Sequence, residues 1–305
     1  MKRILKIVVG GIAAIILAAC TSHVLNSGNR PLPATPDDGL RVAKLNVHYI
    51  VLFQETGPWS VGDWEDRKTS LSQAFDHIDA DVFGFQEMES FGGRDGGGTN
   101  LVLDHLLAEH PDYAAAAVGD WETFPITQPI LYRTSKLTLL DQGWFFFSDT
   151  PDEIYSRTFN GSWPAYATWA EFEPAQGGAA FRVYNVHYEY RSRSNRRLSA
   201  ELTVDRMAPA IDAGMPVILL GDMNAMHGAA TMDILRTAGV EFGRADGSTY
   251  HLNRGINLFG AIDHIGTTDQ WVPLGDVVVV RQQFDDRWPT DHYPVVRDFA
   301  LPVAN

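Results

Sequence analysis

Polar and ionisable side chains follow the apolar stretches in the first and last thirds of the chain. They stand at the ends of predicted strands: Asn46, Gln86-Glu87, Asn185-Val186-His187, Asp222-Met223-Asn224, Asp263-His264 and Thr290-Asp291-His292. A sheet fixes its strand ends and leaves the adjoining loops open, so we expect these side chains to gather at one edge. One carboxylate after a strand is usually a turn former or a helix cap, and one histidine is usually an ordinary polar contact. Their recurrence indicates a site.

The residue types in this set favour a hard divalent cation. Asn, Asp and Glu supply oxygen ligands, which suit Mg²⁺ and also Mn²⁺. Cys20 is the only cysteine in the chain, so no thiolate site competes for a softer metal. Hydrolysis of a phosphate ester needs such a cation together with an acid and a base, because water is a poor nucleophile and an alkoxide a poor leaving group. The set therefore predicts a site where a hard cation acts together with acid–base side chains.

The elements that would position these residues alternate in kind along the chain. Helices are predicted at 65–79, from a cap at Thr99 to Pro111, at 196–213 and in a short stretch that ends at Gly239. Strands are predicted at 40–45, 81–85, 113–118, 129–133, 137–147, 166–173, 180–187, 217–220, 261–266, 276–281 and 294–301. Strand and helix alternate at both ends, with mainly strands between them. This order predicts an α/β (α+β) fold, a four-layer α/β/β/α sandwich of two packed mixed sheets flanked by helices.

The first twenty residues are typical of a targeting segment. A basic start precedes an apolar run at 7–17, which is shorter than the roughly 20 residues that a membrane span needs. The run ends in Leu17-Ala18-Ala19-Cys20, which resembles a bacterial lipobox. We therefore expect a lipoprotein signal peptide at 1–19, a flexible tether at 20–39 that starts at a lipidated Cys20, and one domain at 40–305. The alternative is a buried anchor helix with an incidental cysteine.

These boundaries imply an exported protein, lipid-anchored in the bacterial cell envelope at the outer membrane or the periplasmic face. Loss of residues 1–19 would change the formal net charge from −14 to −17. A strongly acidic body repels duplex DNA, whose binding needs Lys and Arg contacts to phosphates. The charge therefore favours a small phosphate ester or a lipid headgroup over duplex DNA. We infer no protein partner and expect a monomer.

With these residues the sequence resembles the endonuclease/exonuclease/phosphatase family, the deoxyribonuclease I-like superfamily, and within it a secreted bacterial branch. The resemblance covers most of residues 40–301. It rests on the segments LRVAKLNV, DVFGFQEME, PILYRTSKLTLLDQGWFFFSDTPDE, RVYNVHYEYRSRSNRR, VILLGDMNA, AIDHIG and TDHYPVV, in the order that the family has.

The resemblance implies which residues hold the metal and the phosphate. Asn46 and Glu87 would belong to the metal site, with Glu87 as the principal ligand. Asp291 would be a further carboxylate of that site. His187 would contact the scissile phosphate, and Asn224 would hold the phosphate or the transition state.

The resemblance also implies which residues handle protons. Asp222 would orient or deprotonate the attacking water. Asp263 would orient His292 and favour its imidazolium form, because an opposite charge raises the pKa of a histidine. Whether Asp222 or His292 is the base stays open at this point.

Several positions depart from the family pattern. Thr290 replaces a serine, Ala261 stands where Arg or Lys is common, and His264 stands where Tyr is frequent. These changes bear on the substrate more than on the hydrolytic centre. Candidate substrate-binding residues are Arg191, Arg193 and His251; the arginines are equally well explained as a solvated helix start.

Two rivals to a small-ester phosphoesterase stay open. One is a secreted nuclease that acts on DNA or RNA. The other is a catalytically inactive envelope protein that only binds a partner. The second rival predicts eroded catalytic positions, whereas all the residues named above are present.

Overall fold

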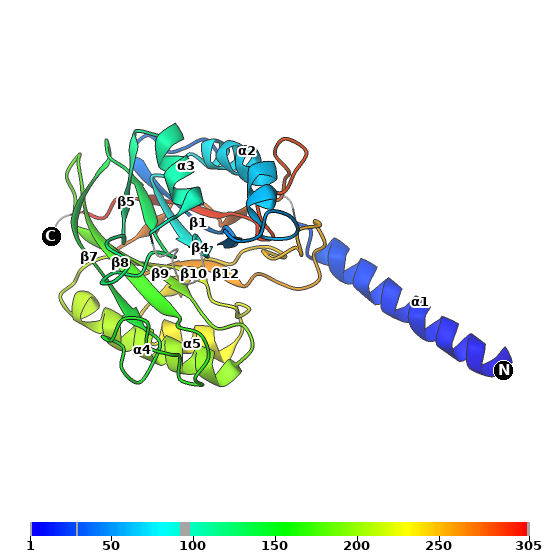
Figure 1. The fold of residues 1–305 in the computed structure, drawn as a ribbon. Helices are drawn as coiled ribbons and strands as arrows, with labels where there is room; N and C mark the ends of the chain where they lie inside the picture. Colours follow the sequence, from blue (N-terminus) through cyan, green and yellow to red (C-terminus); the bar gives the residue numbers. More distant parts are fainter. Residues whose placement is uncertain (1, 29, 92–97, 304–305) are drawn as a thin grey trace.

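Two mixed sheets pack face to face at the centre of the computed structural model, which describes residues 2–28, 30–91 and 98–303 (Figure 1). The first sheet has the order β13 (Val272–Pro273), β15 (Val295–Ala300), β1 (Gly39–Asn46), β3 (Val82–Gln86), β6 (Ile130–Arg133), β5 (Tyr113–Ala116), with β14 (Val278–Val279) beside β15. The second has the order β11 (Glu241–Phe242), β12 (Asp263–Thr267), β10 (Val217–Asp222), β9 (Phe181–His187), β8 (Tyr166–Pro174), β7 (Leu137–Phe146). The short strands β2 (Ile50–Val51) and β4 (Ser90–Phe91) form a separate pair.

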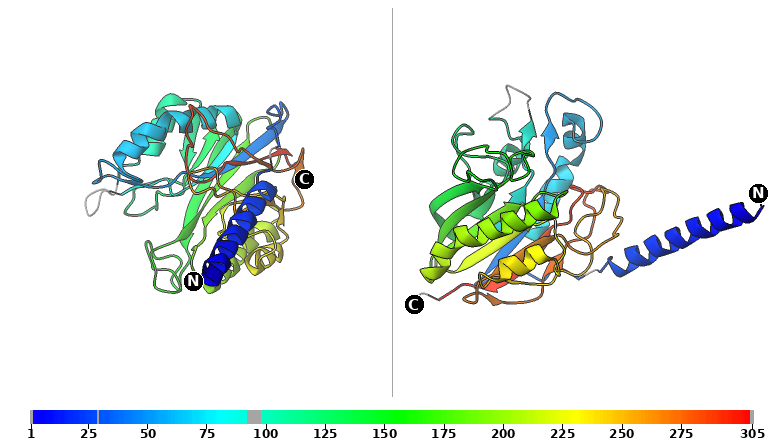
Figure 2. Two further views of the ribbon diagram at one scale, coloured as in Figure 1. Left: turned by 90° about the vertical axis from the view of Figure 1, so that its right-hand side faces the viewer. Right: turned by 90° about the horizontal axis from the view of Figure 1, so that it is seen from below.

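Helices cover the outer face of each sheet. Helices α2 (Val61–Ile78) and α3 (Leu101–Glu109) lie over the first sheet, and α4 (Arg193–Asp212) and α5 (Ala230–Arg236) lie over the second (Figures 1 and 2). Leu71, Phe75 and Ile78 of α2 pack into the same apolar cluster as Phe83 and Phe85 of β3. The predicted sandwich of two mixed sheets with flanking helices is confirmed.

Apolar side chains fill the space between the sheets, and they help to bury the central strands β1 and β10 on both faces. Every residue of β1 and every residue of β10 is buried. Val42 from one sheet and Ile218 and Leu220 from the other belong to one cluster. A continuous Val-Ile-Leu-Leu run is typical of such a fully enclosed strand.

Element ends differ from the sequence prediction at a few places. Asn100, not Thr99, caps α3, because its side chain accepts a hydrogen bond from the Leu103 amide at 3.2 Å. Helix α4 begins at Arg193, three residues early, because Ser192 caps it through the Asn195 amide. The prediction missed β2, β4, β11 and β13, each two residues long, which carry too little pattern to detect.

The N-terminal segment forms one helix that projects from the body, α1 (Lys2–Leu25) (Figures 1 and 2). The helix continues beyond the apolar run at 7–17 on which the expectation of a segment too short to cross a membrane was based. Lys6–Leu25 spans 20 residues with mean hydropathy 2.1 and is 0% buried, which is enough by length and composition. A signal sequence has the same properties. Cleavage before Cys20, its lipidation and the tether at 20–39 stay predictions.

Gly221 occupies a backbone position that an alanine cannot adopt without strain. Its φ is 151°, and a Cβ there would collide with the backbone carbonyl of Val186 in β9. We expect Gly221→Ala to lower the free energy of unfolding by about 3 kcal/mol, from the strained φ and the overpacking together. Urea unfolding would measure the loss. Gly228→Ala is the matched control, since no atom lies within 4 Å of its added Cβ. Equal stability of the two variants would contradict this account.

Candidate active site

The sheet topology brings the predicted polar residues to one edge of the sandwich. Strands β1 and β3 are parallel, and so are β9 and β10, so the carboxyl ends of each pair point the same way. Strand β12 runs antiparallel to β10, and its first residue, Asp263, pairs with Asp222 in the register. Residues far apart in the sequence therefore meet at the place where the two sheets end.

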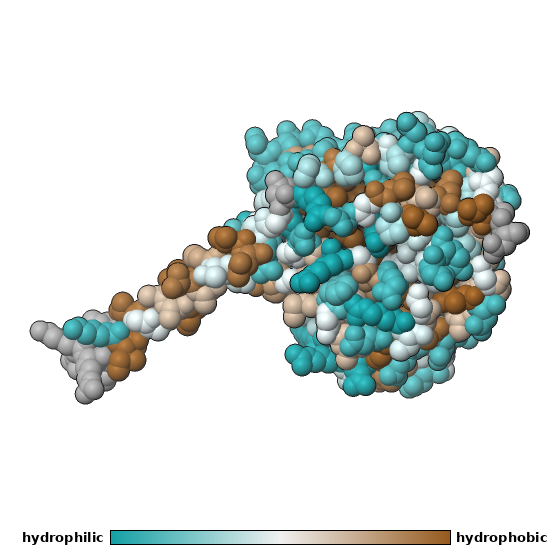
Figure 3. Space-filling model, turned by 180° about the vertical axis from the view of Figure 1, so that it is seen from behind, coloured by the Kyte–Doolittle hydropathy of each residue, from teal (hydrophilic) through white to brown (hydrophobic). Residues whose placement is uncertain are grey.

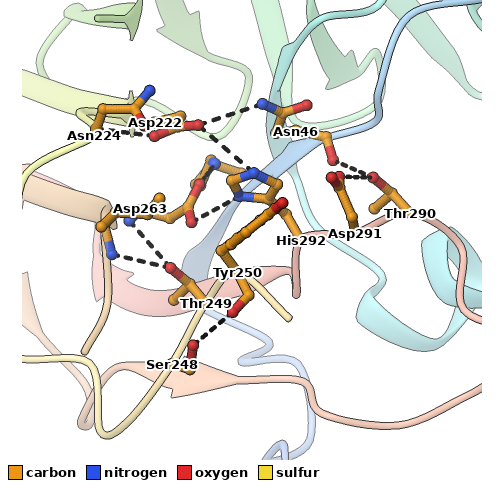
Figure 4. Close-up of polar contacts among 12 residues, drawn as sticks. Asn46, Asp222, Asn224, Ser248, Thr249, Tyr250, Asp263, Thr290, Asp291 and His292 are labelled. Carbon is orange, nitrogen blue, oxygen red and sulfur yellow. Dashed lines mark hydrogen bonds and ion pairs between the residues drawn. The ribbon is translucent and has the colours of Figure 1, made fainter. Parts of the chain in front are cut away.

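Asp222 is the centre of this group (Figure 4). Asn46 donates through Nδ2 to Asp222 Oδ2 at 3.3 Å and to Glu87 Oε1 at 2.9 Å. His187 Nε2 is 3.7 Å from each of these carboxylate oxygens. The backbone amide of Asn224 donates to Asp222 Oδ1 at 2.9 Å. Both carboxylates thus face the same small space.

Asp222 is also contacted by His292, which in turn contacts Asp263 (Figure 4). His292 Nδ1 is 3.0 Å from Asp263 Oδ2, and His292 Nε2 faces Asp222 Oδ2 at 3.8 Å. The ammonium group of Lys44 contacts the other Asp263 oxygen, and both of these side chains are fully buried. Thr249 Oγ1 accepts a hydrogen bond from the Asp263 amide at 3.2 Å. Asp263 and Asp222 thus lie at the two ring nitrogens of His292, and Lys44 and Thr249 hold Asp263 in place.

Sequence reasoning missed Lys44 and Thr249. Lys44 did carry a signal, because the alternation of a strand puts it on the same face as Val42 and Asn46. A lysine between a core residue and a site residue indicates a buried charge partner. Thr249 carried no comparable signal, because its contact depends on how the loop before β12 folds back.

The surroundings of His292 and Asp222, which face each other across the site, shift the pKa values of both. Burial alone would lower the pKa of His292, but the charge and hydrogen bond of Asp263 outweigh it and raise the pKa to about 9. Burial would likewise raise the pKa of Asp263, but Lys44 and His292 hold it well below its usual range. Burial and the negative charge of Asp263 raise the pKa of Asp222. His292 is therefore cationic at neutral pH, and Asp222 is the more basic carboxylate.

The opposite side of the site presents oxygen donors. Burial would raise the pKa of Glu87, but its electrostatic interactions with His187 and His48 and the hydrogen bond from Asn46 lower it. Asp291 is fixed beside Asn46 because Thr290 Oγ1 bridges the Asn46 carbonyl at 2.9 Å and Asp291 Oδ1 at 3.3 Å (Figure 4). Glu87, Asn46 and Asp291 carry the oxygen atoms that a hard divalent cation prefers.

Asp222, Asp263 and His292 also lie close enough together to hold a metal ion, with ligand atoms within 4.8 Å of one another. The Glu87 side is the better candidate for a metal. Asp263 is already neutralised by Lys44, and its second oxygen is used by His292. The group is buried and hydrogen-bonded, which is the environment of a positioned acid–base pair.

Backbone strain gathers at the site. Glu87 has φ 55°, Asn224 has φ 46° and His48 has φ 61°, although none of them is glycine. Each such residue costs about 1 kcal/mol or more and persists only where its surroundings impose it. For Asn224, the surroundings are the Asp222 carboxylate and the Tyr188 carbonyl, to which its Nδ2 donates at 2.8 Å.

The structure does not bring the candidate substrate-binding residues into this group. Arg191 and Arg193 are exposed at the start of α4. His251 is fully buried, stacks on Tyr293 with ring centroids 4.0 Å apart, and accepts the Gly255 amide through Nδ1 at 3.2 Å. Its ring supports the wall of the site and has no exposed surface for substrate.

Comparison with known proteins settles the family. The model of the endonuclease/exonuclease/phosphatase family matches residues 24–292. The chain belongs to this family. The match supports a hydrolase that acts on phosphate esters, and it includes every predicted catalytic and metal residue. The comparison with curated proteins finds no match.

Several solved structures share the fold. An endonuclease/exonuclease/phosphatase family protein from Bacteroides thetaiotaomicron is 23% identical, with a TM-score of 0.72 over 87% of this chain and 98% of that one. A mannosyl-6-phosphatase from Bacteroides thetaiotaomicron VPI-5482 is 23% identical, with a TM-score of 0.69 over 85% of this chain and 99% of that one. The catalytic domain of human Nocturnin, solved with bound sulfate, is 15% identical, with a TM-score of 0.61 over 88% and 96%.

The raised pKa of His292 can be measured directly. Histidine NMR on this chain without added metal should show His292 titrating at about pH 9. His264, whose pKa burial lowers to about 4, should stay neutral. A folded pKa above the unfolded 6.5 contributes stability that is complete below pH 6.5 and lost as the pH rises through about 9. This contribution is about 3 kcal/mol. Titration of His292 near 6.5 would refute the electrostatic account.

Proposed function

We propose that the chain hydrolyses a phosphate ester in the presence of a divalent cation, with Asp222 as the base and His292 as the phosphate-binding cation. The observation that carries this proposal is the Lys44–Asp263–His292 chain aimed at Asp222. It keeps a proton on His292 and leaves Asp222 as the group that can accept one. A base and a cation side by side are what attack of water on a phosphate requires.

Each residue then has a task that follows from its contacts. Asp222 would hold the attacking water and take its proton, oriented by the amide of Asn224 and the side chain of Asn46. His292 would donate to a phosphate oxygen through Nε2, since its Nδ1 is held by Asp263. His187 lies on the other side of Asp222 and would contact the same phosphate.

Glu87, Asn46 and Asp291 would hold Mg²⁺, or Mn²⁺ in its place. A cation bound there supplies positive charge to the phosphate oxygens as negative charge grows on them. The low pKa of Glu87 keeps it ionised and able to bind a cation across the neutral range.

The substrate class follows from charge. The chain carries a net −14, which disfavours a long polyanion and favours a small phosphate ester or a lipid headgroup. Hydrolysis of DNA or RNA is the second candidate, favoured only by the exposed Arg191 and Arg193. A nuclease of that kind would lose affinity steeply with added salt.

Turnover of bis(4-nitrophenyl) phosphate and of 4-nitrophenyl phosphate tests the proposal and separates diesterase from monoesterase activity. We expect EDTA to abolish turnover and Mg²⁺ or Mn²⁺ to restore it. Glu87→Gln should need more Mg²⁺ for half-maximal rate, whereas Glu201→Gln, at an exposed position on α4, should not. Turnover that survives EDTA would remove the metal from the proposal. No turnover on a broad phosphoester panel would favour the inactive binding protein.

A further inference from the structure

An exposed loop beside the active site carries an unusual density of apolar side chains. In the loop 252–259, Leu252 is 40% exposed, Ile256 38%, Leu258 37% and Phe259 38%. Arg254 is exposed in the middle of the loop. Contiguous exposed apolar residues next to a site indicate that the surface contacts something apolar.

The loop is tied to the membrane-directed end of the chain. Ser22 Oγ donates to the Leu258 carbonyl at 2.5 Å, and the Asn257 amide donates to His23 Nδ1 at 3.0 Å. Asn257 Nδ2 also donates to Ser27 Oγ at 2.8 Å. In Figure 1 the end of α1 meets the body at the yellow and orange loops. The loop therefore cannot move far from whatever holds α1.

The geometry of α1 sets how near a bilayer the loop must lie. If Lys6–Leu25 spans a membrane, Ser22 lies three residues, or about 4.5 Å, inside its end. If lipid on Cys20 is the anchor instead, Ser22 is only two residues from it. In both cases Leu258 is held close to the bilayer surface, within reach of the depth of about 5–10 Å to which interfacial segments insert.

Apolar surface continues from α1 onto the body. Leu25 is 76% exposed and Met226 is 55% exposed, and both line the hollow between the end of α1 and Gly260. Figure 3 shows apolar colouring along α1 up to the point where it joins the body. Exposed apolar side chains thus lie on both sides of the junction between α1 and the body.

The same loop is in contact with the catalytic centre. Phe259 stacks on Tyr250 with ring centroids 6.0 Å apart, and Tyr250 lies 5.0 Å from the ring of His292. Tyr250 and His292 also form a backbone bridge. Whatever surface the loop enters is therefore next to the place where a phosphate would bind.

We propose that the loop 252–259 inserts into the bilayer that holds the N-terminus, so that the active site works at the lipid–water interface. Insertion is driven by the apolar side chains, because a chain with net charge −14 is not attracted to an anionic surface. Arg254 would meet lipid phosphates at the rim. This orientation, which rests on the proposed function, assigns as substrate class a phosphate ester presented by a membrane lipid rather than one free in solution.

Lipid-borne quenchers test the insertion without requiring catalysis. The full chain with Cys20→Ser is inserted through α1 into vesicles of phosphatidylethanolamine and phosphatidylglycerol. An environment-sensitive label is attached at Leu258→Cys, or at Leu252→Cys as a second position. The control is Leu140→Cys, which is 49% exposed on β7, a strand on the side of the body away from α1 (Figure 1).

We expect doxyl-labelled lipids to quench the loop labels at least threefold more strongly than the control label. Equal quenching at the three positions would overturn the proposal. So would energy transfer between loop labels on different molecules without lipid quenching, because a second copy would then cover the loop.

Activity separates this inference from the proposed function. Leu252→Ser/Leu258→Ser should lower turnover of an aryl phosphodiester carried on a lipid in the vesicles at least fivefold, and should leave bis(4-nitrophenyl) phosphate unaffected. An equal loss on both substrates would contradict the interfacial role. Absence of turnover on both in the parent chain would refute the proposed function and leave the quenching result standing.

Discussion

The Asp222→Asn variant is expected to fold and to lose about 10³-fold in kcat, the size of effect that a general base supplies. The amide oxygen can still accept the hydrogen bond from the Asn224 amide, now at 2.9 Å, although the new Nδ2 replaces the oxygen that accepts from Asn46. An amide cannot take a proton from water at neutral pH. The loss should therefore fall on kcat rather than on KM for a bis-aryl phosphodiester.

Stability should change in the opposite direction. Burial and the neighbouring Asp263 raise the pKa of Asp222, so the folded state disfavours its ionised form. A neutral isostere removes that penalty, and the thermal midpoint of Asp222→Asn should equal or exceed that of the parent chain. Greater stability with lower activity is typical of a residue kept for chemistry.

Asp205→Asn is the matched control, since Asp205 is exposed on α4. It should leave both kcat and the thermal midpoint unchanged. If Asp222→Asn keeps more than a tenth of the parent kcat, Asp222 is not the base. If it is clearly less stable than the parent, the charge at this position supports the fold and the assignment from its pKa fails.

The sequence allowed the layers and the residues of the site to be predicted, because both depend on local pattern. The Val217–Leu220 run predicts a buried strand wherever it pairs, and Asp222 follows it directly. The resemblance to the family then implied the roles proposed for Glu87 and His292. The order of the motifs along the chain is enough to identify those positions.

Contacts that depend on non-local register could not be predicted in the same way. The pairing of Asp222 with Asp263 exists because β12 runs antiparallel to β10, and nothing local to either strand specifies that partner. The position of Lys44 behind Asp263 joins the two sheets and depends on their packing. His251 was misjudged for the same reason, since burial by Tyr293 is a tertiary contact.

Lys44 is expected to be the residue on which stability depends most strongly within the site. Its side chain and that of Asp263 are 0% exposed, and they pair across the two sheets. Lys44→Met leaves Asp263 buried with His292 as its remaining partner. We expect a loss of about 3–5 kcal/mol in the free energy of unfolding, as for other buried pairs broken on one side. Lys68→Met, which breaks the exposed pair with Glu65 on α2, should change little.

The double variant Lys44→Met/Asp263→Leu distinguishes the two tasks of this pair. Removing both charges eliminates the unpaired carboxylate, so most of the lost stability should return. Activity should not return, because His292 loses the carboxylate that keeps it protonated, and its pKa should fall below the parent value of about 9. Urea unfolding, histidine NMR and turnover measure the three quantities on one protein. Recovery of activity together with stability would show that Asp263 serves only the fold, and that another group holds the proton on His292.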